Sequence, residues 1–288
     1  MPIRPGKITS YIVFLIAVLA FLIPTLLIER NILQHTDGNL TLPWDPAFTN
    51  VAVGKNLAFF GVWGLSKYVF QAASSSLLYP IILVPFFFIA GPHLIIPLLV
   101  NGLAACVLLW KLQRELIRRG LSPLGQLAVL LLVVFCLPLP LLVVSGMEYT
   151  LFLMLLVLFA IRLMRPAHWT LYLYGAFLVA TRYEGLLIVA GAAAFLLYRK
   201  QPRVALLLFL AALAPAIVFG LVASSKGGSF IPAALLQIRN ADVYLSMIIG
   251  TILIIALFAI PLPYRKPWLA CSVLGVIALI RTWSALAG

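Results

Sequence analysis

Four charged residues stand at the ends of apolar runs, where they could do chemistry at the edge of a membrane: Asp45, Glu148, Arg182 and Glu184. A carboxylate in such a place can accept a proton from an attacking hydroxyl group. A fixed cation can stabilise the charge that develops on a departing phosphate. Together these residue types suit a reaction between a phosphate ester carried by the membrane and a hydroxyl group. Further candidate cations lie in other polar segments: Lys67, Lys226 and Arg239.

Each of these residues also has a purely structural explanation. Asp45 could cap the helix that follows it. Glu148 begins an apolar run, and acids are favoured at helix N-termini. Arg182 and Glu184 could neutralise each other within an apolar run. The segment 224–242 could be a solvated loop with ordinary interfacial charges.

The composition places these residues in a membrane protein. Hydrophobic residues make up 64% of the 288 residues and charged residues only 9%, against about 25% charged residues in an ordinary soluble domain. We therefore predict an all-α, polytopic protein with a single transmembrane domain over residues 1–288 and no soluble domain. The net charge of +13 comes from basic residues clustered between apolar runs, which is typical of topology signals and does not indicate nucleic-acid binding. The three cysteines show no pairing or ligand spacing, so neither a disulfide nor a metal site is indicated.

The first apolar run, 11–28, follows two basic residues and has no clear cleavage signal. It predicts a retained signal-anchor helix with a cytoplasmic N-terminus. Residues 29–75 then form an outer loop. Within it we expect a short amphipathic helix along the membrane, with Asp45 near its N-cap and Pro46 at its first position.

The run 76–90 is too short for a full crossing. Its 15 residues reach about 22 Å as a helix, against a hydrocarbon core of about 30 Å. A crossing would also place the basic stretch 111–120 outside, against the positive-inside rule. We therefore predict a juxtamembrane segment that dips into the outer leaflet and returns, followed by a span at 93–110.

The run 169–198 has basic residues on both sides, so both of its ends are expected in the cytoplasm. One helix cannot satisfy this condition. We predict a hairpin of two short helices, 169–181 and 184–198, with Arg182 and Glu184 at its outer apex. The other predicted spans bring the total to about eight: 126–144, 149–164, 204–223, 243–262 and 267–286. On this topology Glu115 is the one acid of the 7 in the chain that lies inside.

Five stretches of the chain resemble those of the C-type glycosyltransferases (GT-C), in particular the arabinofuranosyl- and mannosyltransferase-like branch. In chain order they read "WDPAFTNVAVGKNLAFFGVWG", "SSSLLYP", "SGMEYTLF", "TRYEGLLI" and "SKGGSFIPAALL". Members of this family are multi-span enzymes that take sugars from polyprenyl phosphates. The resemblance implies a GT-C-like helix bundle with an outer-leaflet juxtamembrane segment, and the juxtamembrane segment at 76–90 agrees with it.

The resemblance also implies an activity and its residues. Asp45 would be the general base, Arg182 and Lys226 would hold the lipid phosphate, and Glu148 and Glu184 would orient these groups or the sugar. The sugar would pass with inversion from a polyprenyl-phosphate donor to an envelope glycan, lipid or protein acceptor. We expect this transfer at the outer face of a cell membrane, which in a bacterium would be the inner membrane. A divalent cation could be held by outer carboxylates, although no ligand spacing requires one.

Two other functions stay open. A transporter or lipid flippase would use the hairpin as a discontinuous-helix binding site, and it predicts an inverted repeat. The halves 1–144 and 145–288 share no evident pattern. A non-catalytic, shortened relative is the second alternative, because such enzymes commonly continue with more helices than this chain carries.

Overall fold

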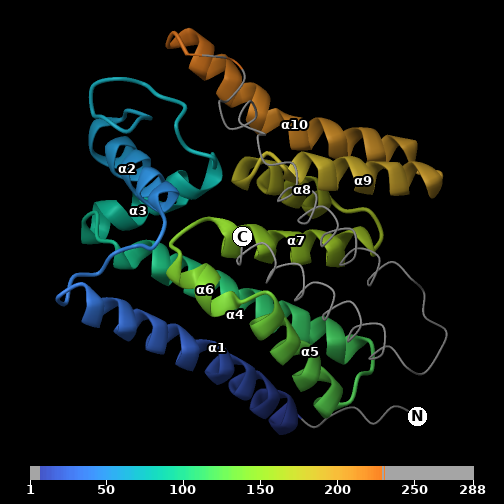
Figure 1. The fold of residues 1–288 in the computed structure, drawn as a ribbon. Coiled ribbons are helices and arrows are strands. Elements are labelled where there is room, and N and C mark those ends of the chain that lie inside the picture. Colours follow the sequence, from blue (N-terminus) through green and yellow to red (C-terminus); the bar gives the residue numbers. More distant parts are fainter. Residues whose placement is uncertain (1–6, 229, 231–288) are drawn as a thin grey trace, which may run out of the picture.

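The computed structural model describes residues 7–228 and residue 230. This part of the chain consists of helices and their connections, which confirms the all-α prediction for it (Figure 1). The ten helices within the described residues are α1 (Lys7–His35), α2 (Asp45–Phe60), α3 (Leu78–Ala90), α4 (Ile95–Arg118), α5 (Pro123–Cys136), α6 (Leu139–Val144), α7 (Tyr149–Leu163), α8 (Trp169–Thr181), α9 (Gly185–Tyr198) and α10 (Pro202–Ser225).

Three of these helices, α1, α4 and α10, are long and apolar enough to cross a membrane. Five others are apolar but shorter: α3, α5, α7, α8 and α9. The 15 residues of α7, for example, make a helix about 22 Å long. These lengths and compositions indicate a multi-pass membrane protein. The runs predicted at 243–262 and 267–286 lie outside the described residues.

Two predicted helix boundaries in the N-terminal part need correction. The first helix does not end at residue 28 but continues to His35, because the first left-handed residues come only at Asp37 and Gly38, with φ of 50° and 81°. The outer segment therefore starts later than predicted. In α2 the N-cap is Trp44, so Asp45 is the first helical residue and Pro46 the second, one position later than expected.

The run 126–144 was predicted as one span, and this is wrong. α5 ends at Cys136 and α6 begins at Leu139. Pro138 lies between them and has no backbone N–H with which to continue the helical hydrogen bonds. The chain therefore breaks into two short helices before it reaches α7.

The amphipathic character predicted for α2 is also not seen. Asn50 and Asn56 are buried, whereas Phe48 and Phe59 are exposed. The polar side chains turn inward because they have partners there: Asn56 donates to the carbonyl oxygen of Gly64 at 2.8 Å, and Asn50 takes part in the site described below. An outer surface of aromatic residues suits contact with lipid.

The break between α8 and α9 falls where the hairpin was predicted. Arg182 has extended backbone, with φ −152° and ψ 134°, and ends α8. Its N–H still donates to the carbonyl oxygen of Leu178 at 3.0 Å. A Cβ at Gly185 would lie 2.8 Å from the carbonyl carbon and oxygen of Leu178, so the close return of the chain needs a glycine here.

The helices pack around two connected apolar cores. One core joins α2, α3 and α4 to α7, α8, α9 and α10. The other joins α1 to α4, α5 and α6 and also contains Val157 of α7. In Figure 1, α7 accordingly lies between α4 on one side and α8 and α10 on the other.

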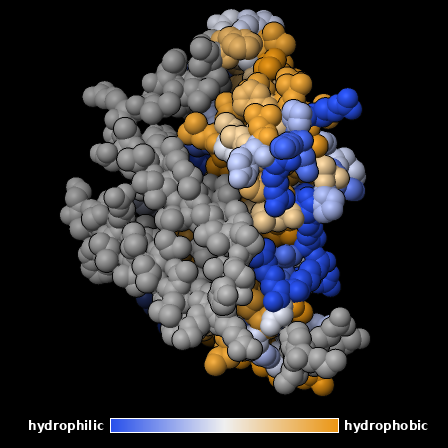
Figure 2. All heavy atoms as spheres, turned by 90° about the vertical axis from the view of Figure 1, so that its right-hand side faces the viewer, coloured by the Kyte–Doolittle hydropathy of each residue, from blue (hydrophilic) through white to orange (hydrophobic). Residues whose placement is uncertain are grey.

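The helix directions give the bundle two ends of different character (Figure 1). The start of α7 and the turn between α8 and α9 lie at the end near α2 and α3. The ends of α4 and α7 and the starts of α8 and α10 lie at the opposite end, where hydrophilic residues gather on the surface (Figure 2). Glu148 and Glu184 are at the first end and Glu115 at the second, as the charge pattern predicts. Which end faces the cytoplasm stays a prediction.

Two glycines of α9 test the close return between α8 and α9. Gly185→Ala should lower the free energy of unfolding by about 1–3 kcal/mol, because the added methyl group overlaps backbone that cannot rotate away. Gly191→Ala is the matched control, since a Cβ there meets nothing within 4 Å; it should be neutral or stabilising by up to about 1 kcal/mol. Thermal unfolding in detergent measures both. Equal behaviour of the two variants would contradict this account of the turn.

Candidate functional site

Glu148 reaches the interior through a tight turn in front of α7. Gly146 in this turn has a φ of 68°, and a Cβ there would lie 2.8 Å from a methyl carbon of Leu42. Two buried polar groups hold the turn: the Tyr79 hydroxyl donates to the carbonyl oxygen of Gly146 at 3.1 Å, and Asn101 Nδ2 donates to that of Met147 at 2.8 Å. The backbone is therefore fixed on both sides of the residue that precedes Glu148.

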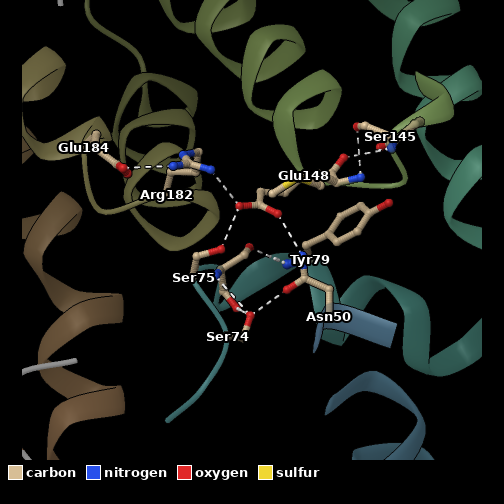
Figure 3. Close-up of polar contacts among 11 residues, drawn as sticks. Asn50, Ser74, Ser75, Tyr79, Ser145, Glu148, Arg182 and Glu184 are labelled. Carbon is tan, nitrogen blue, oxygen red and sulfur yellow. Dashed lines mark hydrogen bonds and ion pairs between the residues drawn. The ribbon is translucent and has the colours of Figure 1, made fainter. Parts of the chain in front are cut away.

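The Glu148 carboxylate is fully buried, and three side chains from three other segments donate to it (Figure 3). Asn50 Nδ2 of α2 lies 2.8 Å from Oε2. The Ser75 hydroxyl and Arg182 Nη1 each lie 2.9 Å from Oε1. Glu148 occupies the N-cap position of α7, but its side chain makes no cap hydrogen bond. The hydrogen-bond partners of the carboxylate are therefore these three side chains and not the backbone N–H groups of α7.

Arg182 links Glu148 to a second carboxylate. Its Nη2 donates to Glu184 Oε1 at 2.9 Å, and its guanidinium carbon lies 4.6 Å from the centre of the Tyr149 ring. The Arg182 side chain is 9% exposed and that of Glu184 25%. The ion pair expected between Arg182 and Glu184 is thus present, but it is half of a larger arrangement that includes Glu148.

Residues 74–76, the serine segment, lie before α3 and form one side of the site (Figure 3). The Ser74 hydroxyl lies 2.7 Å from both Asn50 Oδ1 and the carbonyl oxygen of Ser76, and it can donate to one of them at a time. Ser76 Oγ accepts from the N–H of Tyr79 at 3.0 Å and so satisfies one of the first backbone donors of α3. The segment is fixed to the α8–α9 turn as well, since the N–H of Leu77 donates to the carbonyl oxygen of Ala180 at 2.8 Å.

The buried charges of the site do not cancel. Two carboxylates face one guanidinium within a cluster that is largely closed to solvent. An ion pair in such surroundings adds little net stability compared with apolar groups, but removal of one partner strands the other charge. The cluster therefore fixes the geometry of the segments around it more than it stabilises the fold.

Three donors beside the cluster have no hydrogen-bond partner within the part of the chain that the structure describes: Arg182 Nε, the Tyr183 hydroxyl and Trp63 Nε1. Trp63 and Tyr183 belong to the same small apolar cluster, which includes Leu77 and Ala180. Buried donors are seldom left unsatisfied. Oxygen atoms of a ligand, or groups outside the described residues, would satisfy them.

The other predicted site residues are not part of this cluster. Asp45 is exposed and, among the described residues, makes no hydrogen bond or ion pair; it lies five positions before Asn50 in α2, about 7.5 Å along the helix axis. Lys67 is exposed and lies 5.0 Å from the centre of the Tyr68 ring. Lys226 caps the end of α10 and is exposed. Arg239 lies outside the described residues.

Sequence reasoning missed the uncharged members of the site. Asn50, Ser74, Ser75 and Tyr79 lie in stretches that the resemblance marks, but no role was assigned to them. Their signal is weak, because a serine or asparagine next to an apolar helix is common and its partner can be far away in the chain. Asn50 and Glu148, for example, are 98 residues apart. No group of three or more His, Cys, Asp or Glu side chains placed to hold a metal ion is found in the described ranges.

The difference in burial between the two acids gives a prediction. Glu148→Gln should lower the free energy of unfolding by about 3 kcal/mol, because the amide nitrogen of glutamine would replace a carboxylate oxygen and face a buried donor, either Asn50 Nδ2 or the Ser75 hydroxyl and Arg182. Glu184→Gln removes the same charge from a side chain that is partly exposed, and should cost about 1 kcal/mol or less. Thermal unfolding of the two variants in detergent compares them. A larger loss for Glu184→Gln would show that Glu148 is not the centre of the cluster.

No protein-family model, curated protein or solved structure matches the chain.

Proposed function

We propose that the protein is a membrane glycosyltransferase of the GT-C type. It would transfer a sugar from a polyprenyl-phosphate donor to an acceptor hydroxyl group at the outer face, with inversion at the anomeric carbon. The chain would form a GT-C-like bundle of about eight spans with a juxtamembrane segment that includes α3.

One observation carries the proposal. Four of the five stretches that resemble the family contribute residues to the Glu148 cluster or its immediate supports: Asn50, Ser75, Glu148 and Arg182 represent them in turn. These stretches are far apart in the chain, and a chance likeness of short sequences gives no reason for them to meet. The fifth stretch begins at the end of α10 and continues outside the described residues.

The composition of the cluster fits a ligand rich in oxygen atoms. A sugar phosphate offers many acceptors, and the unpartnered donors at Arg182, Tyr183 and Trp63 would face such acceptors. Glu184, with a side chain that is 25% exposed, could accept hydrogen bonds from sugar hydroxyl groups. A conformational change would be needed to admit the ligand, since Arg182 itself is 7% exposed.

The proposed reaction balances in one displacement. The acceptor oxygen attacks the anomeric carbon from the face opposite the phosphate, and the bond from that carbon to the phosphate oxygen breaks. The phosphate leaves with the electron pair of that bond, and Asp45 takes the proton of the acceptor hydroxyl. Arg182 and Lys226 would stabilise the leaving phosphate. The exposed position of Asp45 at the start of α2 leaves room for an acceptor to approach it.

The general base is tested by a transfer assay in membranes with a panel of polyprenyl-phosphate sugars. Asp45→Asn should lower turnover by about 10²–10⁴-fold, because the amide cannot accept the proton. Asp37→Asn is the matched control in the same outer segment, and its left-handed backbone with φ 50° tolerates asparagine. Turnover in Asp45→Asn equal to that of the control would remove Asp45 from the mechanism.

The proposed orientation is tested with single cysteines in a background without the native ones. A cysteine at Asp37 should react with a membrane-impermeant thiol reagent in intact cells. A cysteine at Arg118, whose side chain is 59% exposed, should react only after the membrane is opened. The reverse pattern would place the Glu148 cluster on the cytoplasmic side and exclude transfer at the outer face.

A further inference from the structure

A pocket at the opposite end of the bundle gathers an excess of positive charge. It lies between the last turns of α4, the end of α7 and the start of α8. Its charged lining residues are Lys111, Arg114, Glu115, Arg118, Arg162 and Arg165. Five cations thus surround one carboxylate. Figure 2 looks at this end of the molecule and shows hydrophilic residues gathered there.

The sequence of α4 places its charged residues on one face. Arg114 and Glu115 follow Lys111 by three and four residues, and Arg118 follows them by four and three, which places all four on one side of the helix. α7 runs alongside α4 and ends nearby at Leu163. Arg162 and Arg165 at its end therefore line the same pocket as the basic residues of α4. A positive-inside signal requires basic residues at this end of the bundle. It does not require them to converge on a pocket.

The single carboxylate cannot neutralise these cations. Glu115 accepts a hydrogen bond from Arg165 at 2.5 Å and lies 3.7 Å from Arg118 Nη1. Lys111 and Arg114 lie over the Trp110 ring, with 4.8 and 4.6 Å to its centre, and this contact leaves their charge uncompensated. Arg162 Nε is buried and has no hydrogen-bond partner among the described residues.

The helix ends explain only part of this charge. The C-termini of α4 and α7 carry partial negative charge, which nearby cations offset. α8 begins at the same pocket, however, and its N-terminus adds partial positive charge instead. Tyr174 of α8 also brings a hydroxyl group to the lining, whereas the Thr170 hydroxyl lies 3.1 Å from His168 Nδ1. An anion with several oxygen atoms would accept hydrogen bonds both from the cationic side chains and from the Tyr174 hydroxyl.

We propose that this pocket binds the phosphate group of an anionic phospholipid from the adjoining leaflet. Basic pockets between helices at the cytoplasmic side are suited to lipid headgroups, and each nearby Lys or Arg contributes about 1 kcal/mol of attraction. The pocket lies at the far end of α7 from Glu148, about 22 Å away along the helix. A headgroup at this depth belongs to the leaflet opposite the Glu148 cluster. The proposal does not depend on the proposed function.

The test uses the full-length protein in nanodiscs of phosphatidylcholine that contain a minor fraction of phosphatidylglycerol. Native mass spectrometry of the released protein measures the ratio of the two lipids retained. The wild type should retain phosphatidylglycerol in excess of its share. The double variant Arg114→Gln/Arg162→Gln should reduce this enrichment about tenfold or more. The matched control Lys200→Gln/Arg203→Gln removes the same charge from exposed residues at the same end, outside the pocket, and should keep the enrichment.

The other outcomes decide against the proposal. Equal loss in both double variants would mean that the charge of this end, and not the pocket, attracts lipid. Absence of enrichment in the wild type would refute a lipid ligand. If inorganic phosphate then raised the unfolding temperature of the wild type but not of the pocket variant, the ligand would be a soluble phosphate.

A second pocket variant serves if Arg114→Gln/Arg162→Gln fails to fold. Arg114→Gln/Arg118→Gln alters only exposed residues and must show the same loss of enrichment.

Discussion

The rest of the bundle depends on one constraint, which is that the Glu148 carboxylate lies where no solvent reaches it. A buried carboxylate must be matched by donors from the protein. Here they come from α2, from the serine segment and from the turn between α8 and α9. Each donor ties its segment to the start of α7. The helices around this point pack through ordinary apolar contacts, and these hydrogen bonds join three further segments to the start of α7.

The short helices follow from the same constraint. α7, α8 and α9 all have an end at the cluster, and their terminal residues there carry the polar groups that it uses. A long helix would keep its backbone groups paired internally and would pass the site without turning. Ending α8 at Arg182 leaves backbone carbonyl groups without helical partners, which in apolar surroundings is tolerated only where other protein groups satisfy them. The bond from Leu77 to the carbonyl oxygen of Ala180 does this for the end of α8.

The sequence predicts the helices better than it predicts their contacts. Charge on both sides of residues 169–198 was enough to place the break between α8 and α9, because that signal is local. The break at Pro138 differs from the prediction of one span, because hydropathy alone shows a continuous apolar run there. Proline is the local signal for such a break. Glu148 and Arg182 stood out as charges in apolar surroundings, but their pairing with each other was not predicted. The inward-facing Asn50 has only a weak signal, because its partner is 98 residues away and no periodicity connects them.

The geometry also restricts how Arg182 could take part in phosphate binding. Two of its terminal nitrogens already donate to carboxylates, and each of those bonds joins groups of opposite charge. A phosphate cannot replace Glu148 at Arg182 without leaving that buried carboxylate without its cation, which is costly. It can approach through Nε, which has no partner among the described residues, or on the side of Glu184, which is partly exposed. The Arg182 guanidinium is therefore held in position by Glu148, and a ligand phosphate would be expected on the Glu184 side of the cluster.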